Sequence, residues 1–138
     1  MKKILISSNM VLGSLGLTYS QCFEKLGLNV IKFDDSLKIN LYIRILEKIS
    51  RNLISKKIQK DFFRIIIESK PDIVFIFKGF HYSPSLLSLI KKKFPKMIFI
   101  YFNPDNPFNN WHYGNTNNWI IKSMPIYDIH FTWGLFLI

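Results

Sequence analysis

The sequence predicts an α/β fold: an open parallel sheet of about five strands with flanking helices, in a Rossmann-like arrangement. Short apolar runs alternate with helix-length stretches along the 138 residues, which is the pattern of parallel α/β construction. The first run, Lys-Ile-Leu-Ile-Ser, does not alternate apolar with polar residues, so we expect a strand buried on both faces. The length fits one domain, residues 1–138, with its own core.

Five apolar runs are predicted to be the strands. They are residues 3–7, 29–33, 73–77, 97–102 and 129–133. The stretches between them are predicted to be helices, covering residues 17–26, 38–68, a segment that starts at Pro84, and 117–124. We expect residues 38–68 to form two helices that meet near Ser55.

Local signals define two of these helices. In the first helix, Tyr19, Cys22, Phe23 and Leu26 have helical spacing and are predicted to form the apolar face, and Gly27 is the expected C′ residue.

The third helix is expected to begin with Ser83 as its N-cap and Pro84 at its first position. The lysines at 91–93 complement the negative end of its dipole.

Composition excludes several protein classes. The chain is 49% hydrophobic, and its single cysteine, Cys22, excludes a disulfide framework or a cysteine-cluster zinc site within it. The longest apolar runs are far shorter than the roughly 20 residues of a bilayer span. We predict a cytoplasmic protein and expect neither metal nor cofactor.

The formal net charge of +10 raises the question of an anionic partner. Residues 38–64 hold eight basic and two acidic side chains. They lack aromatic interleaving on the polar side of the helices, helix-turn-helix spacing and zinc ligands, so nucleic acid is not the expected partner. A solvated helix face and attraction to an anionic membrane surface, which implies peripheral association at its inner face, both stay open.

Polar or glycine-bearing loops follow four of the predicted strands, at the edge where parallel sheets bind ligands. After the first strand, Gly13, Ser14, Gly16 and Thr18 place backbone N–H groups and hydroxyls at a helix N-terminus, where an anion or a sugar hydroxyl can bind. The alternative is a turn that needs two glycines for its backbone shape.

The loop after the third strand carries Lys78, Gly79, His81 and Tyr82. Lys78 stands at the end of a buried strand, where a cation needs solvent or an anionic partner. His81 is a candidate general base, because an unperturbed imidazole has a pKa of about 6.5. A solvated loop histidine is the alternative.

The loop after the fourth strand is a proline-bracketed turn. Pro104 and Pro107 enclose Asp105 and Asn106, and Asn103 precedes them. Two prolines rigidify the turn, so the Asp105 carboxylate is held at the sheet edge, where it can bind sugar hydroxyls or accept a proton. A purely structural Asx turn is equally compatible with this spacing.

Four segments together resemble a known family, the CgeB-like glycosyltransferases of the GT-B class. They are Lys-Ile-Leu-Ile-Ser at 3–7, Lys-Pro-Asp-Ile-Val-Phe-Ile-Phe-Lys-Gly at 70–79, Ile-Tyr-Phe-Asn-Pro-Asp-Asn-Pro at 100–107 and Tyr-Asp-Ile-His-Phe-Thr at 127–132. Nearly the whole chain is covered. Asn106 departs from the family's second acidic residue, which counts against a role that needs paired carboxylates.

The resemblance implies the N-terminal, acceptor-side half of a two-domain glycosyltransferase. Its partners would be a sugar or lipid-linked acceptor and a nucleotide-sugar donor held by a C-terminal domain. Asp105 and His81 are then the catalytic candidates. The binding candidates are Gly13, Ser14, Gly16, Thr18, Lys78, Gly79, Tyr82, Asn103 and Asn106. The apolar end at 134–138 leads us to expect a truncated chain that does not catalyse transfer alone.

A free-standing ligand-binding or membrane-peripheral module is the alternative function. Asp34 and Asp35 follow the second strand, where a carboxylate contacts a ribose in dinucleotide-binding folds. The sequence lacks the glycine fingerprint that accompanies such a carboxylate.

Overall fold

The computed structural model of the protein describes residues 1–36, 41–105 and 118–132, and side chains within residues 1–36, 54–105 and 119–131. Its elements are, in order, β1 (Lys3–Ser8), α1 (Leu15–Lys25), β2 (Asn29–Asp34), α2 (Leu41–Ser69), β3 (Ile73–Phe77), α3 (Pro84–Lys93), β4 (Ile98–Asn103), α4 (Asn118–Ser123), the 3₁₀ helix η1 (Met124–Ile126) and β5 (Ile129–Thr132). The predicted α/β class is confirmed.

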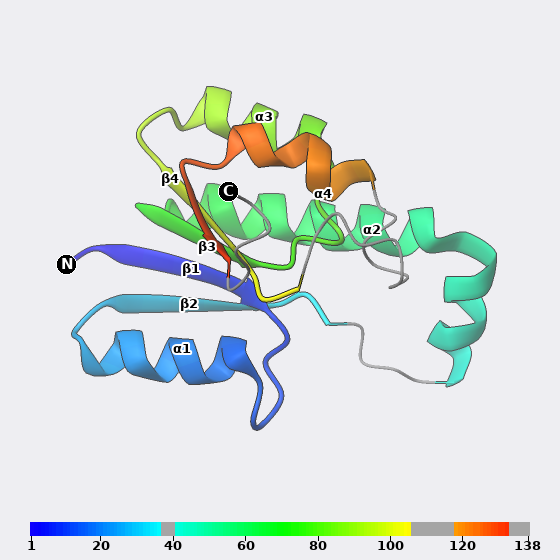
Figure 1. Ribbon diagram of the computed structural model, residues 1–138, viewed down its shortest axis with the longest axis horizontal. Helices are drawn as coiled ribbons and strands as arrows, with labels where there is room; N and C mark the ends of the chain where they lie inside the picture. Colours follow the sequence, from blue (N-terminus) through cyan, green and yellow to red (C-terminus); the bar gives the residue numbers. More distant parts are fainter. Residues whose placement is uncertain (37–40, 106–117, 133–138) are drawn as a thin grey trace.

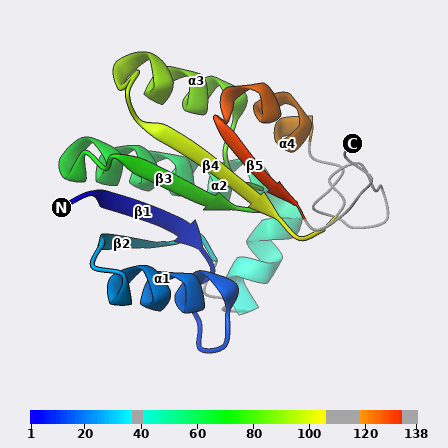
Figure 2. The ribbon, with the colours of Figure 1, turned by 60° about the vertical axis from the view of Figure 1, so that its left-hand side comes forward.

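The five strands form one parallel sheet in the order β2-β1-β3-β4-β5. Helix α1 covers one face, and α2, α3 and α4 cover the other (Figures 1 and 2). The chain runs outward from β1 to β2 on one side and from β3 to β5 on the other. β1 and β3 are therefore the neighbours at which the connection direction reverses, which is the point where open α/β sheets bind ligands.

Two apolar layers lie on the two faces of the sheet, as strand periodicity requires. The layer under α2, α3 and α4 includes Leu5, Phe62, Ile66, Val74, Ile76, Tyr82, Leu87, Ile90, Phe99 and Tyr101. The layer under α1 is built from Ile4, Ile6, Phe75, Phe77 and Phe102. In β1 every residue from Ile4 to Ser8 is buried, which confirms the prediction for the first strand.

The predicted apolar face of α1 is wrong in part. Tyr19 and Phe23 pack toward the sheet, but Cys22 and Leu26 are exposed. The buried positions of the helix are Gly16 and Ser20. At Gly16 the helix approaches Ser8 of β1 closely, because any larger side chain at this position would clash.

One helix, α2, runs through all 29 residues from Leu41 to Ser69, in place of the two predicted helices that meet near Ser55. The segment contains no glycine or proline that would interrupt its backbone hydrogen bonds. Figure 1 shows the path of this helix turning within its teal first half.

The expected signals define the ends of α1 and α3. Ser83 is the N-cap of α3, its Oγ accepts a hydrogen bond from Leu86 N at 3.3 Å, and Pro84 follows. Gly27 follows the end of α1 with φ of 78°. These termini were predictable because each depends on one or two residues of the local sequence.

We predict that Gly16→Ala destabilises the fold by about 1–3 kcal/mol, the usual cost of overpacking. A Cβ at Gly16 would stand 2.4 Å from Ser8 Cβ and 2.8 Å from the Asn9 carbonyl oxygen. Urea unfolding measures the loss. In a Ser8→Gly background the same substitution should cost distinctly less, and an equal cost in both backgrounds would contradict this packing account.

Candidate functional site

The carboxyl edge, meaning the residues at and just beyond the carboxyl ends of the strands, carries polar side chains from four of the strands. Ser7 and Ser8 end β1, and Asp34 ends β2. Lys78 follows β3, and Asn103 ends β4. This convergence follows from the parallel direction of all five strands.

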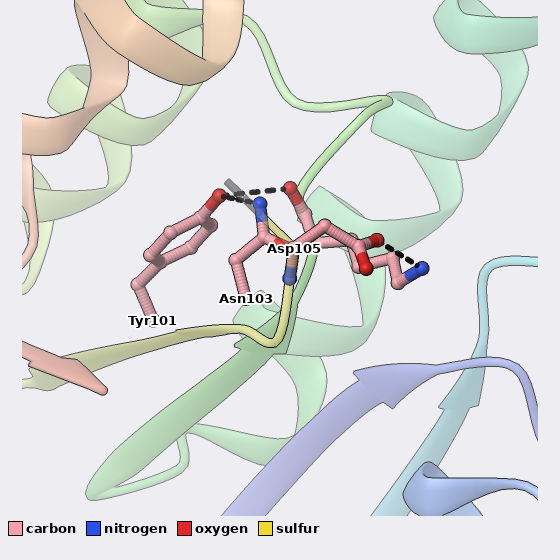
Figure 3. Close-up of polar contacts among 4 residues, drawn as sticks. Tyr101, Asn103 and Asp105 are labelled. Carbon is pink, nitrogen blue, oxygen red and sulfur yellow. Dashed lines mark hydrogen bonds and ion pairs between the residues drawn. The ribbon is translucent and has the colours of Figure 1, made fainter. Parts of the chain in front are cut away.

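Lys78 and Asp105 form an ion pair at this edge, with Lys78 Nζ 2.7 Å from Asp105 Oδ2 (Figure 3). The two side chains are 42% and 44% exposed, so both charges are accessible to a ligand. Such exposure limits the contribution of the pair to stability to less than about 1 kcal/mol. The structure thus brings together a predicted binding residue and a predicted catalytic residue.

A chain of hydrogen bonds positions the Asp105 turn (Figure 3). Asp105 N donates to Asn103 Oδ1 at 3.1 Å, and Asn103 Nδ2 donates to Tyr101 Oη at 3.0 Å. Tyr101 Oη donates to the Lys78 carbonyl oxygen at 3.3 Å. Asn103 is buried, so its amide holds the turn in place and leaves the carboxylate of Asp105 at the surface.

Tyr101 stays a proton donor in this chain. Burial raises the pKa of its hydroxyl to about 12, whereas the hydrogen bond from Asn103 lowers it. The hydroxyl is therefore neutral at physiological pH and can donate to the Lys78 carbonyl oxygen. Sequence reasoning missed this residue, because a tyrosine inside an apolar strand gives no sign that its hydroxyl reaches the edge.

The backbone at Lys78 has an unusual conformation. Lys78 has φ of 61° and Gly79 has φ of 70°, both in the left-handed region. Lys78 N donates to the Phe102 carbonyl oxygen at 2.8 Å, which ties this turn to β4. A lysine in this conformation lowers the stability of the fold by about 1 kcal/mol compared with a glycine at the same position.

Ser7, Asp35 and Tyr82 form a second cluster, which we call the Asp35 cluster. Ser7 Oγ donates to Asp35 Oδ2 at 2.8 Å, and Tyr82 Oη lies 3.4 Å from the same oxygen. The hydroxyls of Ser7 and Tyr82 are also in short contact. The cluster connects the end of β1, the residue after β2 and the loop that precedes α3.

Burial raises the pKa of Asp35 to about 6, and the nearby charge of Asp34 acts in the same direction. Hydrogen bonds from Ser7 and Tyr82 oppose the shift. Asp35 is thus a carboxyl group that titrates close to neutral pH. The sequence placed Asp35 after the second strand, but it gave no indication of the pairing with Ser7 and Tyr82.

The predicted residues of the loop after β1 serve local structure. Ser14 is the N-cap of α1 and accepts a hydrogen bond from Leu17 N at 3.2 Å. Thr18 Oγ1 donates to the Ser14 carbonyl oxygen at 3.0 Å. Gly13 has φ of 81°, and Gly16 packs against Ser8. These contacts account for the loop as a turn and a helix cap, and ligand binding there stays a prediction.

Three predicted residues, His81, Tyr82 and Asn106, remain to be placed. His81 Nδ1 is 3.3 Å from Ser55 Oγ on α2. Tyr82 is fully buried, so its hydroxyl serves the Asp35 cluster and is not presented at the surface. Asn106 lies outside the described residues, as do the side chains of 37–53, which include much of the basic stretch.

Metal sites and membrane spans are both absent from the described residues. No group of three or more His, Cys, Asp or Glu side chains in them is placed to hold a metal ion. None of the helices in this part of the chain combines the length and apolar character of a membrane span.

Comparisons with known proteins do not show a family. A scan against protein-family models finds no matching family, and a search of curated proteins finds no match. The resemblance to CgeB-like glycosyltransferases therefore depends on the sequence segments quoted above.

We predict that Asp35→Asn removes a pH dependence of stability. The pKa of Asp35 is raised in the folded chain from 3.8 to about 6. Below about pH 4 the protonated carboxyl therefore makes its full contribution to the free energy of unfolding. That contribution is lost as the pH rises through about 6. Thermal unfolding of the wild type should show this decline, and Asp35→Asn should flatten it. Asp61→Asn, at an exposed pair with Arg64, is the control and should keep the decline.

We predict that Lys78→Gly is more stable than Lys78→Ala by about 1 kcal/mol, because only glycine adopts positive φ without strain. Both variants lack the ion pair, so their difference isolates the backbone term. Urea unfolding at one pH measures it. A Lys78→Ala variant that is as stable as Lys78→Gly would contradict the left-handed conformation.

Proposed function

We propose that this chain is the acceptor-side domain of a glycosyltransferase, and that its carboxyl edge binds hydroxyl groups of the acceptor. The observation that carries the proposal is the Asp105 carboxylate, which is held at an exposed edge by Lys78 and by the Asn103 turn. A carboxylate fixed in advance binds hydroxyls without a further ordering cost.

The chemistry of the Lys78–Asp105 pair suits a polyhydroxylated ligand. A carboxylate offers about four acceptor positions, and the 2.7 Å contact with Lys78 uses one of them. An ammonium group carries three donors, so Lys78 can also donate to a ligand oxygen. Neighbouring donors and acceptors of this kind match the alternating roles of adjacent sugar hydroxyls.

The fold supports this location. Ligands of open α/β sheets bind beyond the carboxyl ends of the strands, near the reversal point of the strand order. Here that point lies between β1 and β3, and Lys78 directly follows β3. The segments that resemble the CgeB-like family contribute Lys78, Asn103 and Asp105 to this same edge.

The proposed reaction transfers a sugar from a nucleotide-sugar donor, which a separate domain would hold. A bond forms between an acceptor oxygen and the anomeric carbon, and the bond from that carbon to the nucleotide breaks. The acceptor hydroxyl loses its proton in this step, and Asp105 and His81 are the candidate bases. Asp105 is the stronger candidate, because its carboxylate is exposed beside the proposed binding surface.

We expect neutral methyl glycosides to bind weakly at the Lys78–Asp105 pair. Two-dimensional NMR of the ¹⁵N-labelled chain, titrated with the methyl glycosides of glucose, galactose, mannose and N-acetylglucosamine, should shift the amide signals of Lys78, Gly79 and Asp105 for at least one sugar. Asp105→Asn should weaken that binding about tenfold, because a charge-assisted hydrogen bond is replaced by a neutral one.

The control is Asp61→Asn, which removes a carboxylate on α2 that pairs with Arg64 and not with Lys78, and it should leave binding unchanged. Absence of shifts with all four sugars, or equal binding by Asp105→Asn, would contradict acceptor binding at this edge.

A further inference from the structure

The loop between β1 and α1 presents apolar side chains to solvent. Leu12 is 94% exposed, Val11 beside it is 54% exposed, and Leu15 at the start of α1 is 41% exposed. Single apolar residues are common on protein surfaces, but three within five consecutive positions are a local concentration that marks an interaction surface. We call Val11, Leu12 and Leu15 the loop tip.

Hydrogen bonds within the loop hold the tip in a defined turn. Ser14 N donates to the Val11 carbonyl oxygen at 3.0 Å, and Gly13 has φ of 81°, as the third residue of a type II turn requires. Val11 N donates to Asn9 Oδ1 at 2.9 Å. Both backbone polar groups of Val11 are therefore paired within the loop, which lowers the free-energy cost of moving the tip out of water.

The sequence around the loop tip carries no charge. Residues 9–23 contain no Asp, Glu, Lys or Arg, although these residues make up 20% of the chain. The exposed positions of α1 within this range are Leu15, Thr18, Gln21 and Cys22. The solvent side of a surface helix is normally rich in charged residues, and depletion of charge is typical of the centre of an interaction surface.

The shape of this surface and the charge of the chain favour a membrane over a protein partner. Figures 1 and 2 show the β1–α1 loop projecting beyond α1, so the tip is a protrusion and not a flat face. The formal net charge is +10, and residues 38–64 hold eight basic and two acidic side chains. A protruding apolar tip on a strongly basic chain fits a lipid surface with anionic headgroups.

We propose that the loop tip inserts into an anionic membrane surface. Val11 and Leu12 enter the interfacial region, and the basic residues of the chain are attracted to the headgroups. The loop follows the end of β1, so the membrane contact lies on the side of the sheet that carries the Lys78–Asp105 pair. This proposal goes beyond the proposed function and does not depend on it.

Sedimentation with lipid vesicles tests the proposal. The wild type should bind vesicles of phosphatidylcholine mixed with phosphatidylglycerol, and should bind vesicles of phosphatidylcholine alone more weakly. Leu12→Gln should weaken binding to the mixed vesicles about tenfold, because a leucine side chain then no longer leaves water. The variant should keep the fold, since Leu12 is almost fully exposed.

Leu26→Gln is the matched control. Leu26 is 75% exposed and lies at the opposite end of α1, so both variants lose one exposed leucine and differ only in its position. The control should bind the mixed vesicles as the wild type does. Three results overturn the proposal: no binding of the wild type to the mixed vesicles, equal binding by Leu12→Gln and the wild type, or an equal loss in both variants.

A fluorescent probe at position 12 measures insertion directly. Leu12→Cys in a Cys22→Ser background leaves one cysteine, which can be labelled with a nitrobenzoxadiazole group. Mixed vesicles should increase the emission of this probe and shift it to the blue, whereas the same probe in Leu26→Cys should keep its spectrum. An unchanged spectrum at position 12 would show that charge alone holds the chain on the vesicle, which contradicts insertion of the loop tip.

Discussion

The burial of β1 on both faces and along both edges is the constraint on which the carboxyl edge depends. β1 pairs with β2 and β3, and α1 lies against it. Polar groups at its end therefore have little access to water and must find protein partners. Ser7 satisfies this requirement through Asp35 and Tyr82, and Ser8 leaves room only for a glycine at position 16. One strand end thus sets the positions of α1, of the residue after β2 and of the β3–α3 loop.

The elements that sequence reasoning predicted correctly have causes that are local in the sequence. β3 was predicted with its exact bounds, because its apolar run is enclosed by an Asp and a Lys. The start of α3 depends on Ser83 and Pro84 alone. The buried face of α1 was missed because smallness, and not hydrophobicity, selects Gly16 for its contact with Ser8 of β1. The apolar spacing along the helix gives no sign of that contact.

Local and long-range causes also distinguish the two parts of the candidate site. Lys78 and Asp105 each follow an apolar run, and adjacent parallel strands bring such positions together. The Asp35 cluster requires the strand order β2-β1-β3, since β1 must lie between the strands that carry its partners. Apolar periodicity predicts that strands exist but not how they are ordered. The sequence therefore pointed to each of Ser7, Asp35 and Tyr82 only as loop or strand residues, and their contact came from the fold.

The carboxyl edge holds two carboxyl groups whose surroundings differ in charge. Asp105 is half exposed beside an ammonium group, whereas Asp35 is enclosed by two hydroxyls and lies near a second carboxylate. In the sheet, β1 and β3 lie between β2, which precedes Asp35, and β4, which precedes Asp105. The β3–α3 loop bridges the two groups, because it begins at Lys78 and reaches the Asp35 cluster at Tyr82. The two carboxyl groups therefore share the β3–α3 loop as a common neighbour.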